Sequence, residues 1–181
     1  MIPAIRPKHF RPTQGGTVLI MAMTFLLILS LIGVTSMTTV ALEEKMSGNM
    51  SDKNVAFQTA ESALVAGEIW VGGQMNKPVF DPAVTNDGLH LPSATSTPVW
   101  DNTTGVWSSG DLFSYPALNN VSVAPSYIIE DLGAVPDNNG SLVLPANYKS
   151  SGKNVFRVTA RANGRTDATV AMIQSVYEKR F

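Results

Sequence analysis

The residue types that most often carry catalysis or bind metals are few and scattered in this chain of 181 residues. There is no cysteine, which excludes disulfides, thiolate metal sites and cysteine nucleophiles. The two histidines are His9 and His90, and neither belongs to a recognisable triad or metal-binding cluster. We therefore predict that the protein is not an enzyme, and we expect no cofactor and no bound metal.

One short segment, Asp137-Asn138-Asn139-Gly140, superficially resembles a calcium-binding loop. It lacks the alternating ligand spacing and the distal glutamate of an EF-hand. Asp and Asn before Gly are also ordinary turn formers. We interpret the segment as a turn, with calcium binding as the alternative.

The distribution of charge argues against a nucleic-acid-binding protein. The formal net charge is −1, but the first eleven residues carry three basic side chains and no acidic one. From Glu43 onward the chain has ten Lys and Arg against fourteen Asp and Glu. No basic groove interleaved with aromatic residues is present either, so we expect no nucleic acid among the partners.

A stretch of 26 residues from Thr17 to Leu42 contains no charged side chain and is followed by Glu43 and Glu44. A bilayer core about 30 Å thick is spanned by about 20 helical residues. The apolar region of a cleavable secretory signal is shorter, about 7–15 residues. The rest of the chain is too small and polar to surround such a helix, so residues 17–42 are predicted to span a membrane.

The residues ahead of this stretch set its predicted orientation. Arg6, Lys8 and Arg11 form a basic flank that should remain in the cytoplasm, and the acidic remainder should lie outside. Residues 1–16 thus read as a short basic leader. The predicted topology is a single pass with the N-terminus inside and the C-terminus outside.

Residues 43–72 are predicted to continue the same helix as an amphipathic segment. Apolar or small residues recur there at helical spacing, at Met46, Met50, Phe57, Ala60, Leu64, Gly67 and Val71. The acidic residues, Asp52 and Glu61 among them, lie mostly off this stripe. Gly72-Gly73 and then Pro78 are the expected stop signals. The stripe packs either on the protein's own sheet or on partner helices, and the helix has its weakest point at Ser47-Gly48-Asn49.

Residues 73–181 are predicted to form a small domain that ends in a β-hairpin. Trp100 and Trp107 flank a predicted tight hairpin and are expected to pack in a core. Strands are predicted at Tyr127–Leu132, at Ser141–Leu144 and at Val155–Ala162, where apolar and polar residues alternate. The Asn163-Gly164 turn then leads into a last strand, Ala168–Tyr177. The predicted fold class is α+β, with one long N-terminal helix packed on a small antiparallel sheet.

A basic leader, a glycine, an apolar helix and an amphipathic continuation together resemble the class III signal of type IV pilin-like proteins. More specifically, the run Leu42-Glu43-Glu44-Lys45-Met46-Ser47-Gly48-Asn49, followed by Asp52 to Glu61, resembles the N-terminal region of the PilX family of minor pilins. The motif positions are Glu43, Glu44, Met46, Gly48, Asn49, Asp52, Phe57, Gln58 and Glu61. The resemblance implies a pilin-like fold, cleavage by prepilin peptidase between Gly16 and Thr17, and methylation of Thr17; cleavage after Gly15 is the alternative.

The resemblance also implies a role and a location. A minor pilin of this family would start in the bacterial inner membrane, help to initiate pilus assembly with other minor pilins, and contact the major pilin through its N-terminal helix. Major pilins carry a glutamate as the fifth residue of the mature chain, and here that residue is Met21. A subunit without this carboxylate fits the filament tip, beside an adhesin, better than the shaft.

Two other functions remain open on the sequence alone. The first is an adhesion or aggregation module displayed on the pilus, with contacts made by residues 74–150. The second is a pseudopilin of a type II secretion system, which shares the same signal.

Overall fold

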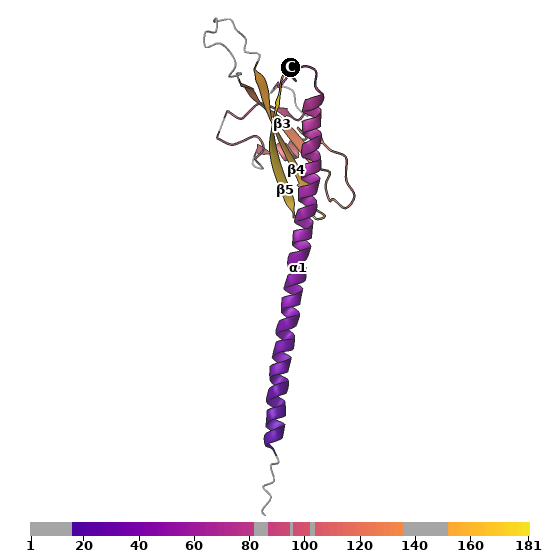
Figure 1. Cartoon of the computed structure of the whole chain (residues 1–181), viewed down its shortest axis with the longest axis vertical. Coiled ribbons are helices and arrows are strands. Elements are labelled where there is room, and N and C mark those ends of the chain that lie inside the picture. Colours follow the sequence, from indigo (N-terminus) through magenta and orange to yellow (C-terminus); the bar gives the residue numbers. More distant parts are fainter. Residues whose placement is uncertain (1–15, 82–86, 95, 102–103, 136–151) are drawn as a thin grey trace, which may run out of the picture. The chain divides into compact units, whose positions relative to one another are not determined.

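The computed structural model describes residues 16–81, 87–94, 96–101, 104–135 and 152–181. Two helices and five strands are assigned there (Figure 1): α1 (Thr17–Gly73), β1 (Leu89–His90), α2 (Val106–Ser109), β2 (Phe113–Ser114), β3 (Ser126–Val135), β4 (Lys153–Asn163) and β5 (Val170–Lys179). The predicted α+β class, with a long N-terminal helix and a small sheet, is confirmed. The leader up to Gly15, the Asp137–Gly140 segment and the strand predicted at Ser141–Leu144 lie outside the described residues.

The chain divides between Ser47 and Gly48 into two units. In the first unit the described residues from Thr17 onward are all helical and all exposed. Hydroxyl groups in this apolar segment bond to carbonyls of their own helix: Thr24 Oγ1 donates to Met21 O at 2.8 Å, and Ser36 Oγ to Ile32 O at 2.9 Å. The segment is long and apolar enough to cross a membrane. Residues 47–49, the predicted weak point, are helical.

The second unit contains the sheet, in the order β1-β3-β4-β5, with β2 also paired to β3. The β3–β4 and β4–β5 pairs are antiparallel, as predicted, whereas the two-residue β1 runs parallel to β3. The three long strands coincide with predicted ones. The turn between β4 and β5 is longer than the predicted Asn163-Gly164 pair, because residues 164–169 form a loop closed by a bond from Gly164 N to Thr169 O.

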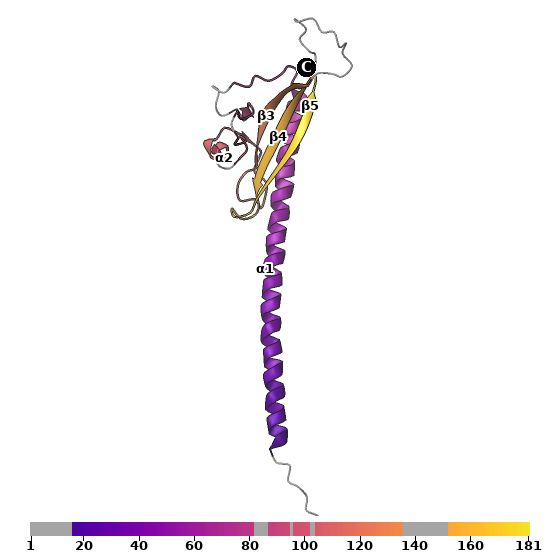
Figure 2. The ribbon, with the colours of Figure 1, turned by 90° about the vertical axis from the view of Figure 1, so that its left-hand side faces the viewer.

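The core lies between the C-terminal part of α1 and one face of β3 and β4, which run beside it in both views (Figures 1 and 2). Phe156, Val158 and Ala160 alternate along β4 toward the helix and are fully buried. The helix meets them with small side chains. At Gly67 an added Cβ would lie 2.6 Å from Val158 Cγ1 and 3.0 Å from the Tyr127 ring. The helix therefore approaches the sheet more closely than any larger residue at position 67 would permit.

The predicted apolar stripe on α1 is partly wrong. Ala60, Gly67 and Val71 are buried as expected, but Met46, Met50 and Phe57 are 66%, 68% and 51% exposed. The buried positions are Asp52, Ala56, Thr59, Ala60, Ala63, Gly67 and Val71. Asp52, predicted to lie off the packing face, belongs to it. Close contact with the sheet selects small side chains, so the larger apolar ones turn outward.

The opposite face of the sheet buries an ion pair. Glu130 on β3 is fully buried and lies opposite Arg157 on β4. The Arg157 guanidinium donates two hydrogen bonds of 2.7 Å to the two Glu130 oxygens. This bond to Glu130 raises the pKa of Arg157 above its usual value. A buried carboxylate is stable there because its charge is fully paired.

Trp100 and Trp107 do not form the predicted hairpin. Trp107 lies on the four-residue helix α2, which is flanked by Gly105 and Gly110 with φ of 75° and 82°. These left-handed glycines reverse the chain at both ends of α2, so no strand can continue from either side. The Trp107 Nε1–H donates to Trp100 O at 2.9 Å. Both rings are half-buried and lie outside the main core, in which Trp70 packs instead.

The helix ends at Gly73, where the glycine pair predicted a stop. Lys179, near the end of β5, donates from Nζ to Val71 O at 3.1 Å and to Gly72 O at 2.6 Å. A positive charge on the free carbonyls at a helix C-terminus is favourable. The last strand therefore ties down the end of the first helix.

We expect Gly67→Ala to lower the free energy of unfolding by about 1–3 kcal/mol, because the new methyl group overlaps Val158 and Tyr127. Urea unfolding of the full chain in detergent, followed by tryptophan fluorescence, measures this change. Gly48→Ala is the matched control, since an added Cβ there meets nothing within 4 Å. The control should gain roughly 0.5–1 kcal/mol from better helix propensity. Equal effects of the two substitutions would contradict the close approach.

Candidate assembly site on the N-terminal helix

The two predicted processing residues lie at the start of α1. Gly16 is the first described residue, and Thr17 is the first residue of the helix. The first helical hydrogen bond here runs from Ile20 N to Gly16 O, at 3.2 Å. Cleavage between them would therefore leave a mature chain that is helical from its first residue.

Met21, four residues further on, is 64% exposed on the same apolar segment. The first turn of α1 carries no acidic residue. From Thr17 to Leu42 the chain offers no carboxylate to a neighbour, and the first two are Glu43 and Glu44. The side chains of this segment present dispersion contacts and hydroxyl groups only.

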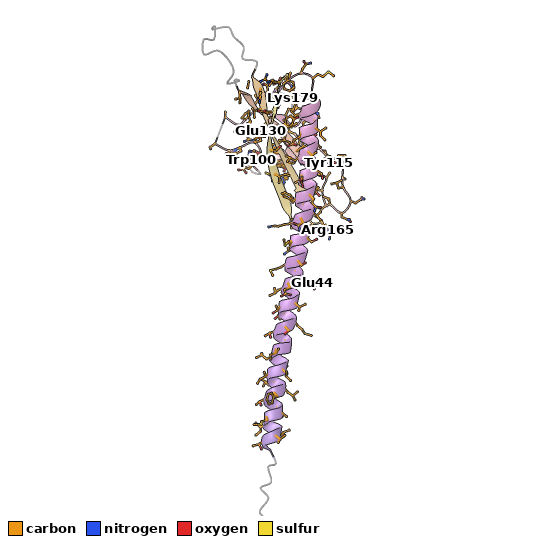
Figure 3. The ribbon with its side chains drawn as sticks, viewed as in Figure 1. Glu44, Trp100, Tyr115, Glu130, Arg165 and Lys179 are labelled. Carbon is orange, nitrogen blue, oxygen red and sulfur yellow. The ribbon has the colours of Figure 1, made fainter. Side chains whose placement is uncertain are left out.

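The motif residues split into two groups in the structure. Glu43, Glu44, Met46, Gly48 and Asn49 are exposed on α1 (Figure 3 marks Glu44). Phe57, Gln58 and Glu61 are exposed as well. Asp52 alone among the motif residues is buried. The motif thus combines one residue with an internal role and eight that remain available for contacts with other chains.

Asp52 holds the loop between β4 and β5 against the helix. Its Oδ1 accepts a hydrogen bond from the Arg165 backbone N at 2.5 Å, and its Oδ2 accepts one from Thr166 Oγ1 at 2.6 Å. Figure 3 shows Arg165 next to α1. This contact joins positions more than a hundred residues apart in sequence. The six-residue loop supplies the Arg165 and Thr166 donors that bind the carboxylate.

These donors stabilise the ionised form of Asp52. The Thr166 hydroxyl is the largest cause, followed by Thr169 and by the backbone of Arg165 and Thr166, and together they hold the pKa of the Asp52 carboxyl below its ordinary value of 3.8. Burial acts in the opposite direction and is outweighed. Asp52 is therefore ionised at neutral pH and contributes to the stability of the fold.

The outward motif residues border two shallow grooves beside α1. Gln58 lines one of about 280 Å³ together with Asn119, Asn120 and Arg165. Gln58 also lines a second of about 480 Å³ with Glu61, Val65 and Tyr115. Val65, which lines the second groove, is one of three exposed apolar residues at helical spacing on α1, together with Phe57 and Ile69. This side of the helix offers a mixed apolar and polar contact surface.

His90 pairs with Asp111 and not with a candidate nucleophile. Its Nε2 lies 3.0 Å from Asp111 O, and its Nδ1 lies 3.9 Å from Asp111 Oδ2. These contacts anchor β1 to the segment ahead of β2. Across the described ranges no group of three His, Cys, Asp or Glu side chains is arranged to hold a metal ion.

Sequence reasoning missed the partners of Asp52. The available signal was the polar run Arg165-Thr166-Asp167 after Asn163-Gly164, which is longer than a tight hairpin needs. It also missed Lys179 as the cap of α1 and the Glu130–Arg157 pair. Each of these contacts joins positions far apart in sequence, so no local pattern marks them.

Two protein-family models match the chain. Residues 14–65 match the model described as PilX N-terminal, and residues 75–179 match the model described as Type IV pilus assembly protein PilX C-term. No curated protein and no solved structure gives a significant match.

We expect Asp52→Asn to destabilise the fold at pH 7, because it removes the charge that the loop donors stabilise. Since the folded pKa is lowered, the wild-type contribution is complete above the unfolded pKa and is lost as the pH falls through the folded value. The difference in unfolding free energy between wild type and variant should therefore shrink below about pH 4. Urea unfolding of both proteins across pH 2.5–7 measures it.

Glu61→Gln is the matched control for this experiment, because Glu61 is an exposed carboxylate on the same helix. Its stability profile should follow that of the wild type at every pH. A profile for Asp52→Asn that also runs parallel to the wild type would show that the carboxylate contributes nothing.

Proposed function

Because the chain belongs to the PilX family of type IV pilus assembly proteins, we propose that this minor pilin helps to initiate pilus assembly with other minor pilins and sits at the filament tip. The observation that carries the proposal is the apolar first part of α1, which is exposed throughout. Such a surface requires lipid or other helices to cover it. Before assembly the cover would be the inner membrane, with the N-terminus in the cytoplasm; in the pilus it would be the helices of neighbouring subunits.

The absence of an acid at Met21 supports a terminal position. A carboxylate in an apolar helix bundle is costly unless a neighbouring positive charge pairs with it, so such a pair fixes the register between subunits. A chain with methionine at this position cannot make that pair. It would then be suited to begin a filament, with no subunit ahead of it, and to contact a tip adhesin there.

The partners in this proposal are the prepilin peptidase, the other minor pilins and the major pilin. The peptidase would act on the chain as a substrate. The pilin contacts would be made by α1, through the apolar segment and through the outward side that carries Phe57, Gln58 and Glu61. The PilX family consists of structural pilus components, and the proposed role is accordingly structural.

Mass spectrometry of the protein isolated from pili should show a mature chain that begins at N-methylated Thr17. Gly16→Val should leave the leader attached, because a branched side chain would occupy the predicted cleavage position. Gly15→Ala is the matched control and should be processed normally. An unprocessed chain that begins at Met1 would contradict the proposal, and a chain that begins at Gly16 would move the cleavage site by one residue.

Deletion of the gene should strongly reduce the number of surface pili counted by electron microscopy, and the wild-type chain should restore it. Normal piliation with lost adhesion or aggregation would instead indicate an adhesion module. Normal piliation with lost protein secretion would indicate a pseudopilin. Both results would contradict a role in initiation.

The location is tested in the same complemented strain. Gold labelling of sheared pili should find the wild-type chain at one end of each filament and at low copy number. Met21→Glu, which adds the missing carboxylate, should shift part of the label into the shaft. An even distribution of the wild-type chain along the filament would contradict the tip location.

A further inference from the structure

The two outer edges of the sheet are finished differently. Beside β3 the edge is formed by β1 and β2, which contain two residues each. Beyond them β3 carries a shift in its register between Asp131 and Gly133, and Asp131 is paired with Lys77 at 2.6 Å. Short strands, irregularities and charges are the usual protection of a sheet edge. The opposite edge is the ten-residue strand β5, which Figure 2 shows as the outermost of the three long strands.

The strand β5 has none of these protections along most of its length. It contains no proline, and its first charged residue is Glu178. Its pairing with β4 runs from Val170 to Lys179 without a shift in register. In the part of the chain that the structure describes, no residue of β5 is buried, and the only strand beside it is β4. A long, regular and uncharged edge of this kind is a template for pairing with another strand.

The pattern of hydrogen bonds between β4 and β5 identifies the backbone groups that face the open edge. Gly164 N donates to Thr169 O at 2.9 Å, so these two residues form a hydrogen-bonded pair at the end of the ladder. Bonded and non-bonded pairs alternate along an antiparallel ladder, and the register here is continuous. Every second residue of β5 from Ala171 to Lys179 therefore bonds to β4. The remaining residues direct their N–H and C=O groups to the open edge: Val170, Met172, Gln174, Val176 and Glu178.

The side chains beside this edge leave room for a further strand. Val170 and Val176 lie on the face that points away from α1 and are 40% and 67% exposed. On the face toward α1, Ile173 and Tyr177 pack against the core but are only half-buried. Adjacent strands lie about 4.8 Å apart, and their opposite side chains contact each other on each face. A strand added at this edge would therefore cover apolar surface on both faces of the sheet.

We propose that the open edge of β5 binds an extended segment of another protein as a further strand of the sheet. The backbone of the segment pairs with the outward N–H and C=O groups of β5. Its apolar side chains cover Ile173 and Tyr177 on one face and Val176 on the other. In this mode of recognition the backbone bonds supply affinity, and the side chains select the segment.

The direction of α1 favours a different protein over a second copy of this chain. Asp52 binds the loop that precedes β5, and Lys179 binds the C-terminal end of α1, so within the second unit β5 and α1 run in the same direction. Two copies joined by antiparallel β5 edges would have these parts of α1 pointing in opposite directions. The proposed function requires one direction for all anchored chains and few copies at the tip. This step alone rests on the proposed function.

Amide hydrogen exchange tests whether the edge is open. In the purified full chain in detergent micelles, NMR should show that the N–H groups of Gln174 and Val176 exchange at least about tenfold faster than those of Ile173 and Ser175. The last two bond to β4, whereas the first two face solvent. Equal protection along β5 would show that the edge is already covered and would overturn the proposal.

Photo-cross-linking in whole cells tests the occupant. The full chain carries p-benzoyl-phenylalanine in place of Val176, and irradiation should join it to a segment of another protein, identified by mass spectrometry of the cross-linked peptide. The same probe in place of Val123, which is 50% exposed on a loop of the second unit, should not capture that segment. An adduct formed only with a second copy of this chain would overturn the choice of occupant, and absence of any adduct would overturn the docking edge.

Gln174→Pro removes one outward N–H group and no bond to β4, a change that edge strands tolerate. It should lower the yield of the adduct at least about tenfold, because the added strand loses a backbone bond and meets the proline ring. Gln174→Thr is the matched control. It loses the same side-chain bond to Thr159 Oγ1 but keeps the N–H, and it should cross-link like wild type. Equal yields from the two variants would show that the contact does not use the backbone, and would overturn strand addition.

The exchange measurement and the cross-link at position 176 keep every backbone N–H of β5, so they test the proposal even if Gln174→Pro unfolds the domain. The adduct is scored in cells and separately from the pilus counts. An adduct together with normal piliation after deletion would contradict the assembly role alone. Reduced piliation after deletion without an adduct would contradict strand addition alone.

Discussion

The close approach of α1 to β3 and β4 is the constraint on which the rest of the second unit depends. With Val158 and Tyr127 packed against Gly67, the buried helix positions from 56 to 67 carry only small side chains: Ala56, Thr59, Ala60, Ala63 and Gly67. The larger apolar residues of the helix, Phe57, Val65 and Ile69 among them, are consequently excluded from the protein's own core and remain exposed. The helix therefore has two apolar sides. One stabilises the domain, and the other is left for the contacts with neighbouring subunits that the proposed assembly role requires.

A contact made of small residues buries little area per residue, so its ends need fixing by polar groups. Asp52 does this at one end, where its carboxylate binds the loop between β4 and β5. Lys179 does it at the other, where its ammonium group binds the last carbonyls of the helix. Both residues join the first element of the unit to the last hairpin. The direction of the helix on the sheet is thus set by two charged contacts, with the Ala and Gly stripe between them.

The sequence predicts long elements well because their signals are repeated. The uncharged run, the glycine pair at 72–73 and the alternation along β4 place α1 and the long strands close to their observed ends. The rotation of α1 about its axis is not predictable in the same way, because residues 46–71 contain more apolar side chains than one sheet can cover. Size decides among them: Ala56 and Ala63 are buried and Phe57 is not. Short elements such as α2 contain too few residues to show a period, so the sequence predicts a strand at Trp107 where the structure has a helix.

Local sequence patterns also fail to predict the contacts on the face of the sheet that points away from α1. Arg157 and Arg161 occupy equivalent outward positions on β4. The alternation of apolar and polar residues therefore predicts the same environment for both. They differ because the partner strand places Glu130 opposite Arg157 and Ser126 opposite Arg161. This difference is set by the strand register, which depends on pairing between residues about thirty positions apart. A local sequence pattern therefore cannot predict it. A carboxylate opposite the first arginine gives it an ion-pair partner on the neighbouring strand, whereas the second arginine has a serine opposite it and lies over the Trp107 ring. Identical residue types on one strand thus acquire different surroundings from their neighbours alone.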